Sequence, residues 1–426
     1  MEESNVLDAG TVWMVTSAAM VLLMTPGLAI FYGGMTRAKS SLNMIMMSFV
    51  SMGLVGVVWV LWVHGMTGGD GWAGVVGNPA GDLGLTGTMA EGGLVAAAYG
   101  ATFAIIAVAL ISGAVADRFK FVTWCVFVPV WTTVVYAPLA YMVWGGGLLS
   151  ADGAIGARLG EALDFAGGLV VHISAGVAAL VLALMLGKRH GFGVDPGHRP
   201  HNVPFTMLGA ALLWFGWFGF NGGAAGSVDE LGLIWVDTLA AGAAGMLGWV
   251  FVEWLRRGRP TSIGTASGIV SGLVAITPAC AYVSPLGAVV IGLVSGAASA
   301  LAVNLKYRLG FDDSLDVVGV HLTAGILGTV LIGFFALPDE GRAGLFYGGD
   351  AGLLVAQTVA VLVAVVFTAV VTTAIALVLR GTMGLRVSKE DEERGVDLTL
   401  HDESAYDVGF GGVPVPAEAR LAAADG

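Results

Sequence analysis

Apolar runs of about twenty residues alternate with short polar segments along most of the chain. Eleven such runs occur. Each except the eighth, which is short and rich in glycine, has ample length to cross a bilayer as an α-helix. The predicted spans are 12–35, 42–65, 92–115, 121–144, 164–187, 203–223, 232–255, 263–279, 282–303, 315–337 and 353–380.

The composition supports a polytopic membrane protein. Of the 426 residues, 56% are hydrophobic and 12% are charged, whereas a soluble domain has roughly 25% charged residues. The 66 glycines suit close packing of helices in lipid. The net charge of −12 resides largely in the extramembrane ends, and no basic stripe occurs, so we expect no nucleic-acid binding. The opening MEESNVLDAG lacks the basic region of a signal peptide, which predicts that the first span is retained.

The basic residues predict the orientation. With the N-terminus outside, 17 of the 19 Lys and Arg residues fall in inner loops or in the C-terminal segment, and only Arg158 and Arg342 fall outside. This asymmetry follows the positive-inside rule, and ten or twelve spans would break it. We therefore predict an all-α polytopic protein of the plasma membrane with eleven transmembrane helices, its N-terminus outside and its C-terminus inside.

Two similar segments place one histidine each inside an apolar span. VVHISAGV (170–177) carries His172 in the fifth span, and GVHLTAGI (319–326) carries His321 in the tenth. An odd number of spans per copy inverts the second copy, and inverted repeats place substrate sites near the membrane midplane. The expected organisation is an extracellular N-terminus (1–11), a five-helix repeat (12–187), a cytoplasmic linker (188–202), an inverted five-helix repeat (203–337), an eleventh helix (353–380) and a cytoplasmic tail (381–426), whose residues 408–426 are expected to be a loose terminus.

The depths of the two histidines do not match when each is measured from the Leu-Asp pair before it. His172 follows Asp164 by eight residues, or ~12 Å of helix, and His321 follows Asp316 by five, or ~7.5 Å. They agree only if the tenth span begins within the membrane, which the stretch LGFDDSL permits.

A histidine at membrane depth has three interpretations: a core residue, a metal ligand or a functional group. A single one is usually a core residue, but equivalent positions in two repeats favour a function. Zinc needs three or four ligands, and His64 is the sole other histidine within a span. We therefore expect neither a metal nor another cofactor.

Several longer strings resemble the ammonium transporter family (Amt/MEP, related to the Rh glycoproteins), from about residue 11 to 407. The resemblance implies a homotrimer in which each protomer has its own pore, with PII-type signalling proteins binding at the cytoplasmic face. Ammonium would be recruited in an outer vestibule and lose a proton, and ammonia would pass an apolar channel while the proton crosses separately. The strings are LLMTPGLAIFYGGMTRAKSSLNMIMMSF, MVWGGGLL, LDFAGGLVVHISAG, GWFGFNGG, ITPACAYV, DDSLDVVGVHLTAG and GLRVSKEDEERGVDLTLHDESAY.

The same resemblance assigns the site residues. Trp144 would recruit the cation by cation–π attraction, although a tryptophan at a span end is also typical of the aromatic belt. Asp164 would support recruitment, and its position at a span start also suits an N-cap. Ala224 stands where the family usually has a vestibule serine, so one hydrogen-bond acceptor is missing. The assigned gate is Phe103 and Phe220, and the assigned pore residues are His172, His321 and Trp217.

These features predict a transporter for ammonium or ammonia and not an enzyme. One alternative is an ammonium sensor, which would signal through a fused domain; only about 46 residues follow the eleventh span, which favours transport. A second alternative is a cation channel, but the chain shows no loop signature of a potassium filter, which is built from rings of backbone carbonyls. A membrane metalloenzyme is disfavoured by the scarcity of metal ligands.

Overall fold

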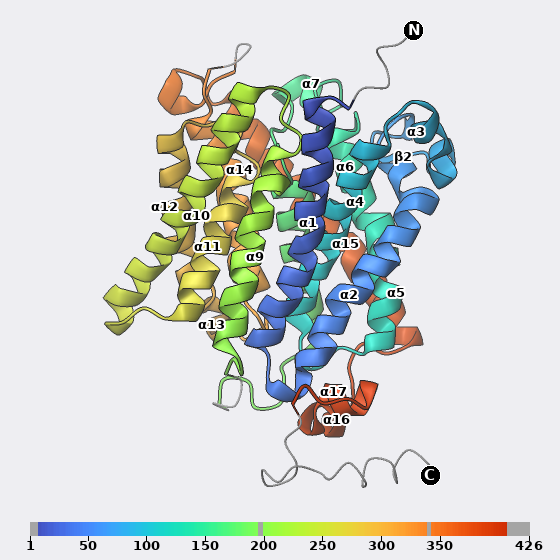
Figure 1. Cartoon of the computed structure of the whole chain (residues 1–426), viewed down its shortest axis with the longest axis vertical. Coiled ribbons are helices and arrows are strands. Elements are labelled where there is room, and N and C mark those ends of the chain that lie inside the picture. Colours follow the sequence, from blue (N-terminus) through green and yellow to red (C-terminus); the bar gives the residue numbers. More distant parts are fainter. Residues whose placement is uncertain (1–6, 195–198, 339–341, 407–426) are drawn as a thin grey trace.

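The computed structural model describes residues 7–194, 199–338 and 342–406, and this part of the chain is almost entirely helical. The long helices run side by side between two ends of the molecule (Figure 1). We call the end that carries α16 (Lys389–Arg394) and α17 (Val396–His401) the C-terminal face. The opposite end, where α1 (Ala9–Met35) begins, is the N-terminal face.

The remaining elements follow in chain order, with π and 3-10 turns marked η. They are η2 (Ala38–Ser40), α2 (Ser41–Val58), η3 (Trp59–Val63), η4 (His64–Thr67), β1 (Gly71–Trp72), β2 (Val76–Gly77), η5 (Pro79–Leu85), α3 (Thr86–Ala90), α4 (Leu94–Ile111), η6 (Ser112–Val115), α5 (Phe121–Trp131), η7 (Thr132–Tyr136), α6 (Ala137–Trp144), α7 (Gly156–Leu159), η8 (Gly168–Ile173), α8 (Ser174–Leu186), α9 (Val203–Gly222), α10 (Val228–Arg257), α11 (Ser262–Ile276), α12 (Pro285–Ala302), α13 (Leu305–Leu309), η10 (Val318–Leu322), α14 (Thr323–Phe335), η11 (Leu345–Tyr347) and α15 (Gly352–Thr382).

The predicted all-helical membrane fold is confirmed. Within the described residues, 10 helical segments are long and apolar enough to cross a membrane. The shorter apolar helix α11 occupies the position of the expected eighth span. The number of crossings, the orientation and the repeat boundaries stay predictions.

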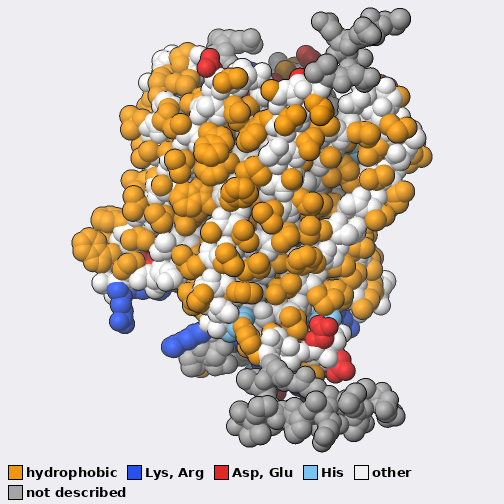
Figure 2. All heavy atoms as spheres, in the orientation of Figure 1, with side chains coloured by type: hydrophobic (Ala, Val, Ile, Leu, Met, Phe, Trp, Pro, Cys, Tyr) orange, Lys and Arg blue, Asp and Glu red, His pale blue; other side chains and the backbone are white. Residues whose placement is uncertain are grey.

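The outer surface of the bundle matches a lipid environment. Figure 2 shows hydrophobic side chains covering the sides of the molecule, while charged side chains gather toward the two ends. Large apolar side chains such as Phe215, Leu247 and Phe251 are more than half exposed. Such a surface is costly in water and favourable in hydrocarbon.

Glycine permits the closest helix contacts. A Cβ added at Gly209 of α9 would overlap the backbone of Phe31 in α1, and one at Gly296 of α12 would overlap the backbone of Gly245 in α10. Helices in lipid gain most from such close packing, because burial of apolar surface drives little association there.

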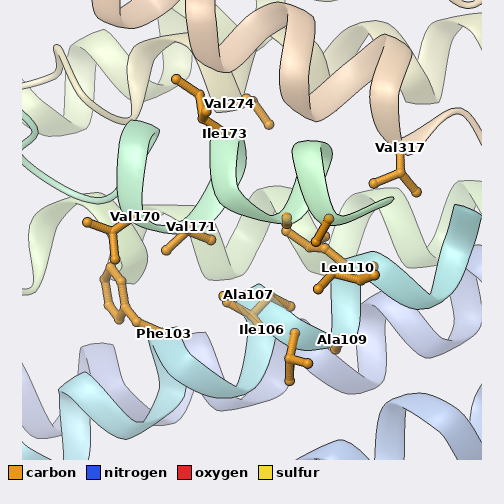
Figure 3. Close-up of a cluster of buried hydrophobic side chains, with 14 of the residues drawn as sticks. Phe103, Ile106, Ala107, Ala109, Leu110, Val170, Val171, Ile173, Val274 and Val317 are labelled. Carbon is orange, nitrogen blue, oxygen red and sulfur yellow. The ribbon is translucent and has the colours of Figure 1, made fainter. Parts of the chain in front are cut away.

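An apolar core joins α4 to η8, the segment that carries His172. Figure 3 shows Phe103 and Ile106 of α4 facing Val170 and Val171 of η8. All four side chains are at most 5% exposed. This packing fixes the two segments that carry Phe103 and His172 relative to each other.

The C-terminal tail is fastened to the bundle. Both carboxylate oxygens of Asp397 accept backbone amides at the start of α2, from Leu42 (3.0 Å) and Asn43 (2.8 Å). Glu392 is 1% exposed, accepts the amide of His190 at 2.7 Å and pairs with Arg386 at 2.7 Å. The acidic run is thus more than a solvated surface segment. The predicted loose terminus, 408–426, lies outside the described residues.

A buried ion cluster joins four loops at the C-terminal face. Arg189 donates to Asp117 (2.9 Å) and, through two guanidinium nitrogens, to Asp312 (2.9 and 3.0 Å). Arg37 approaches Asp117 from the first loop at 3.5 Å. Burial raises the pKa of Asp117, but Arg189 and Arg37 outweigh this effect and lower that pKa to about 2. Asp117 therefore stays ionised at neutral pH.

We expect Arg189→Met to destabilise the protein by about 3–5 kcal/mol, because it removes the guanidinium that both buried carboxylates share and leaves Asp117 with Arg37 alone. Arg189→Lys should recover part of this loss, since one ammonium cannot reproduce the forked contacts. Thermal unfolding in detergent measures both effects, with the exposed Arg259→Met as control. Equal melting temperatures for Arg189→Met and the wild type would contradict the structural role of the cluster.

Candidate functional site

The two histidines of the repeated segments meet inside the bundle. His172 lies in the π turn η8 and His321 in the π turn η10, and the two side chains are 2% and 4% exposed. Their Nδ1 atoms are 3.3 Å apart, and the rings stack with centroids 5.4 Å apart. One Nδ1 must donate and the other accept, so the neutral pair carries one proton in this contact.

A buried carboxylate starts each of the two helices. Asp164 accepts four backbone amides, from Gly167 and Gly168 on one oxygen and from Leu169 and Val170 on the other. These hydrogen bonds form the N-cap that the sequence analysis gave as one interpretation of Asp164. Gly167, which directly precedes η8, has a φ of 109°, and this backbone conformation favours glycine.

The residue equivalent to Asp164 is Asp313, and the predicted equivalence of Asp316 is wrong. Asp313 accepts the amides of Val317 (3.1 Å) and Val318 (2.8 Å), whereas Asp316 pairs with Lys306 at 2.6 Å. Each histidine therefore follows its capping carboxylate by eight residues. This equal spacing removes the mismatch in depth that the sequence suggested.

Two phenylalanines form a stacked pair above His172, toward the N-terminal face. The rings of Phe103 and Phe220 lie 4.2 Å apart at 15°, and Phe220 is 6.0 Å from the ring of His172. Tyr99 holds this pair, because its hydroxyl donates to the carbonyl of Phe220 at 2.6 Å and its ring meets the edge of Phe103. Sequence reasoning missed Tyr99, which lies one helical turn before Phe103.

A vestibule of about 380 Å³ lies on the side of this pair that faces the N-terminal face. Phe103 and Trp144 lie edge to face in its wall, with ring centroids 6.4 Å apart, and Ala224 contributes to the same wall. Trp144 is 41% exposed, and its indole donates to the carbonyl of Asp164 at 2.7 Å. The carboxylate of Asp164 instead faces the backbone of η8, and Asp164 is not among the described residues that line the vestibule.

A much narrower cavity of about 20 Å³ lies on the opposite side of the pair, toward the C-terminal face. Phe220, His172, His321 and Trp217 line it together with apolar residues of α1 and α4. The Trp217 ring stacks on His172 at 5.5 Å, and its indole donates to Thr277. The Nε2 atom of His172 is buried and lacks a hydrogen-bond partner among the described residues. A cavity of this size holds about one water-sized molecule.

The described residues contain no group of three or more His, Cys, Asp or Glu side chains arranged to bind a metal ion.

The vestibule wall also contains residues that sequence reasoning did not assign to it. They include Trp59, His64, Thr67, Tyr136 and Phe165. An aromatic run at the outer end of the second span, WVLWVH, was the available signal for Trp59 and His64.

An apolar helical bundle with an aromatic vestibule, a stacked ring pair and a narrow buried cavity is typical of a membrane transport protein. The model of the Ammonium Transporter Family matches residues 12–406. The chain is 48% identical over 436 residues to the ammonium transporter of Mycobacterium tuberculosis, covering 95% of this chain and 91% of that protein. It is 44% identical to the ammonium transporter of Aquifex aeolicus, covering 94% of each chain.

Solved structures agree with these relatives. A protein described as a sensor Amt protein matches with a TM-score of 0.84 and 28% identity, covering 92% of this chain and 98% of that one. Mep2 of Saccharomyces cerevisiae matches with a TM-score of 0.81 and 32% identity, covering 91% of this chain and 92% of that one.

The chain belongs to the ammonium transporter family, as its motifs predicted. It is thus a multi-pass protein of the plasma membrane and not an enzyme.

We expect Asp164→Asn to lower stability by about 2 kcal/mol, although asparagine is a good N-cap elsewhere. Both carboxylate oxygens accept amides, so the side-chain NH₂ of asparagine would face two backbone donors. Thermal unfolding measures the loss, and the exposed Asp152→Asn on the same face is the matched control. An unchanged melting temperature for Asp164→Asn would show that the cap contributes little.

Proposed function

We propose that the protein recruits ammonium in the vestibule, removes a proton near the phenylalanine pair and passes ammonia along the histidine-lined passage. The order of the three parts carries this proposal. A wide aromatic vestibule opens toward the N-terminal face, a stacked ring pair closes its floor, and a passage of molecular width follows. The N-terminal face would then be the outside.

The vestibule suits a small cation. Its described lining contains the aromatic rings of Trp144 and Phe103 and neither Lys nor Arg. The face of an aromatic ring attracts a cation by ~1–2 kcal/mol where water is partly excluded. Because Ala224 brings no hydroxyl, aromatic faces and other polar groups of the wall must provide the attraction.

The passage suits a neutral molecule. Phe103, Phe220 and Trp217 are each at most 5% exposed, and a cation in such surroundings would lose its water at a cost of several kcal/mol. The cavity of about 20 Å³ has no room for a hydration shell. Ammonia, which is close to water in size, fits without a charge.

The histidine pair offers ammonia both kinds of hydrogen bond. When one Nδ1 donates to the other, the first imidazole has a free lone pair on Nε2 and the second carries a proton there. The pair therefore presents one acceptor and one donor to the passage while it remains neutral. The same contact between Nδ1 atoms, 3.3 Å long, gives a route for a proton between the two rings.

The similarity to a structure described as a sensor Amt protein supports a second candidate, an ammonium sensor. A sensor would need the vestibule but not a conducting passage. We further propose a homotrimer, and a PII-type regulator that contacts the C-terminal face near α16 and α17. Both extensions rest on the family resemblance.

We expect the reconstituted wild-type protein to carry a current or flux driven by an ammonium gradient. Potassium at the same gradient should give at most about one hundredth of that signal, because it cannot shed charge by losing a proton. Electrical recording on proteoliposomes, with empty liposomes as control, provides the measurement. Binding of ammonium without any flux would favour the sensor, and an equal potassium current would refute the proposed selectivity.

We expect His172→Ala and His321→Ala each to abolish charge movement or to admit potassium, because either change breaks the contact between the Nδ1 atoms and widens the passage. The readouts are the ammonium-to-potassium current ratio and the melting temperature on the same preparation. His190→Ala, which removes a half-exposed imidazole at the C-terminal face, is the matched control. If current and selectivity are unchanged in both variants, the histidine pair only packs the core and takes no part in transport.

A further inference from the structure

His64 lies in the wall between two cavities at the N-terminal face. One is the vestibule of about 380 Å³, and the other is an outer pocket of about 390 Å³. His64 and Thr67 line both. His64 therefore borders both the vestibule and the pocket next to it.

The imidazole of His64 is held in a defined orientation. Its Nδ1 lies 3.1 Å from Oδ2 of Asp82, and its ring meets Trp59 edge to face at 5.5 Å. Asp82 is itself fixed, because its Oδ1 accepts the amides of Gly87 (2.8 Å) and Thr88 (3.2 Å). The His64 side chain is 24% exposed.

The state of Asp82 decides which nitrogen of His64 carries the proton. Partial burial raises the pKa of Asp82, but the hydrogen bonds from Thr88, Gly87 and His64 outweigh this and hold the pKa below its usual value. Asp82 is thus ionised at neutral pH and can only accept, so Nδ1 of neutral His64 donates. The lone pair of His64 then lies on Nε2, which has no protein partner among the described residues.

The surrounding charge favours a cation. Asp70, Asp82 and Glu91 line the outer pocket, and neither cavity has Lys or Arg in its described lining. A recess lined by one sign of charge concentrates ions of the opposite sign. The outer pocket therefore raises the local concentration of cations next to His64.

We propose that Nε2 of His64 accepts a hydrogen bond from ammonium in the vestibule, and that Asp82 positions His64 for this by fixing its tautomer. The ligand class is a protonated small amine with a free N–H, such as ammonium or methylammonium. Potassium has no N–H to donate, so this contact also contributes to selectivity. The inference rests on the proposed recruitment of ammonium in the vestibule.

Three variants test the acceptor in the reconstituted full-length protein. His64→Phe keeps the ring against Trp59 and removes both nitrogens, and we expect it to raise the KM for ammonium roughly fivefold to tenfold with little change in Vmax. Asp82→Asn should raise the KM similarly, because its NH₂ would donate to Nδ1 and move the ring proton to Nε2. His64→Gln restores a side-chain acceptor and should recover part of the affinity.

Thr86→Val is the matched control for loop loosening. It removes the hydrogen bond from Thr86 to the carbonyl of Leu83 in the same loop, and Thr86 lines neither cavity. We expect its KM to equal that of the wild type. Asp82→Asn leaves the imidazole and its packing in place, so the test stands even if His64→Phe fails to fold.

The outcomes separate this inference from the proposed function. A wild-type protein without ammonium flux contradicts the proposed transport and, with it, the acceptor role. Wild-type flux with an unchanged KM in Asp82→Asn and in folded His64→Phe overturns the acceptor role alone. An equal KM increase in Thr86→Val would assign the effect to the loop, which also overturns it.

Discussion

The capping of two helix starts inside the protein is the constraint on which the rest of the site depends. In lipid no water satisfies a free backbone amide, so a helix that begins at depth needs an internal acceptor. Asp164 and Asp313 supply it at η8 and η10. Because each cap stands eight residues before a histidine, His172 and His321 arrive at the same level and their Nδ1 atoms meet. The narrow cavity below the phenylalanine pair is lined by both rings of that contact.

Apart from the buried caps Asp164 and Asp313, the charged groups described above lie toward the two ends of the molecule, and each end uses them differently. At the C-terminal face, Arg189 binds two buried carboxylates and Asp397 caps α2, so charge there fastens loops and tail to the bundle. At the N-terminal face, Asp70 and Glu91 are exposed around an open pocket, so their charge attracts cations from solution. Between them, the narrow cavity is lined by aromatic and imidazole rings and by apolar side chains.

The segment between α2 and α4 contributes to both the fold and the vestibule wall. Asp82 binds two backbone amides of this loop and the imidazole of His64, so one carboxylate both shapes the loop and orients a vestibule side chain. The vestibule wall thus combines residues from η3, η4, α4 and α6 that are distant in sequence. Its chemistry depends on how these elements converge rather than on any one segment.

The sequence by itself determined the all-helical membrane fold, the family and the two repeated histidines, because periodic apolar runs and contiguous motifs are local properties of the chain. Hydrogen-bond partners were decided by the tertiary structure. Asp313 rather than Asp316 caps η10, both oxygens of Asp164 are occupied, and Glu392 is buried beside Arg386. Carboxylates a few residues apart look alike in sequence, and only the packed backbone selects which one faces unpaired amides.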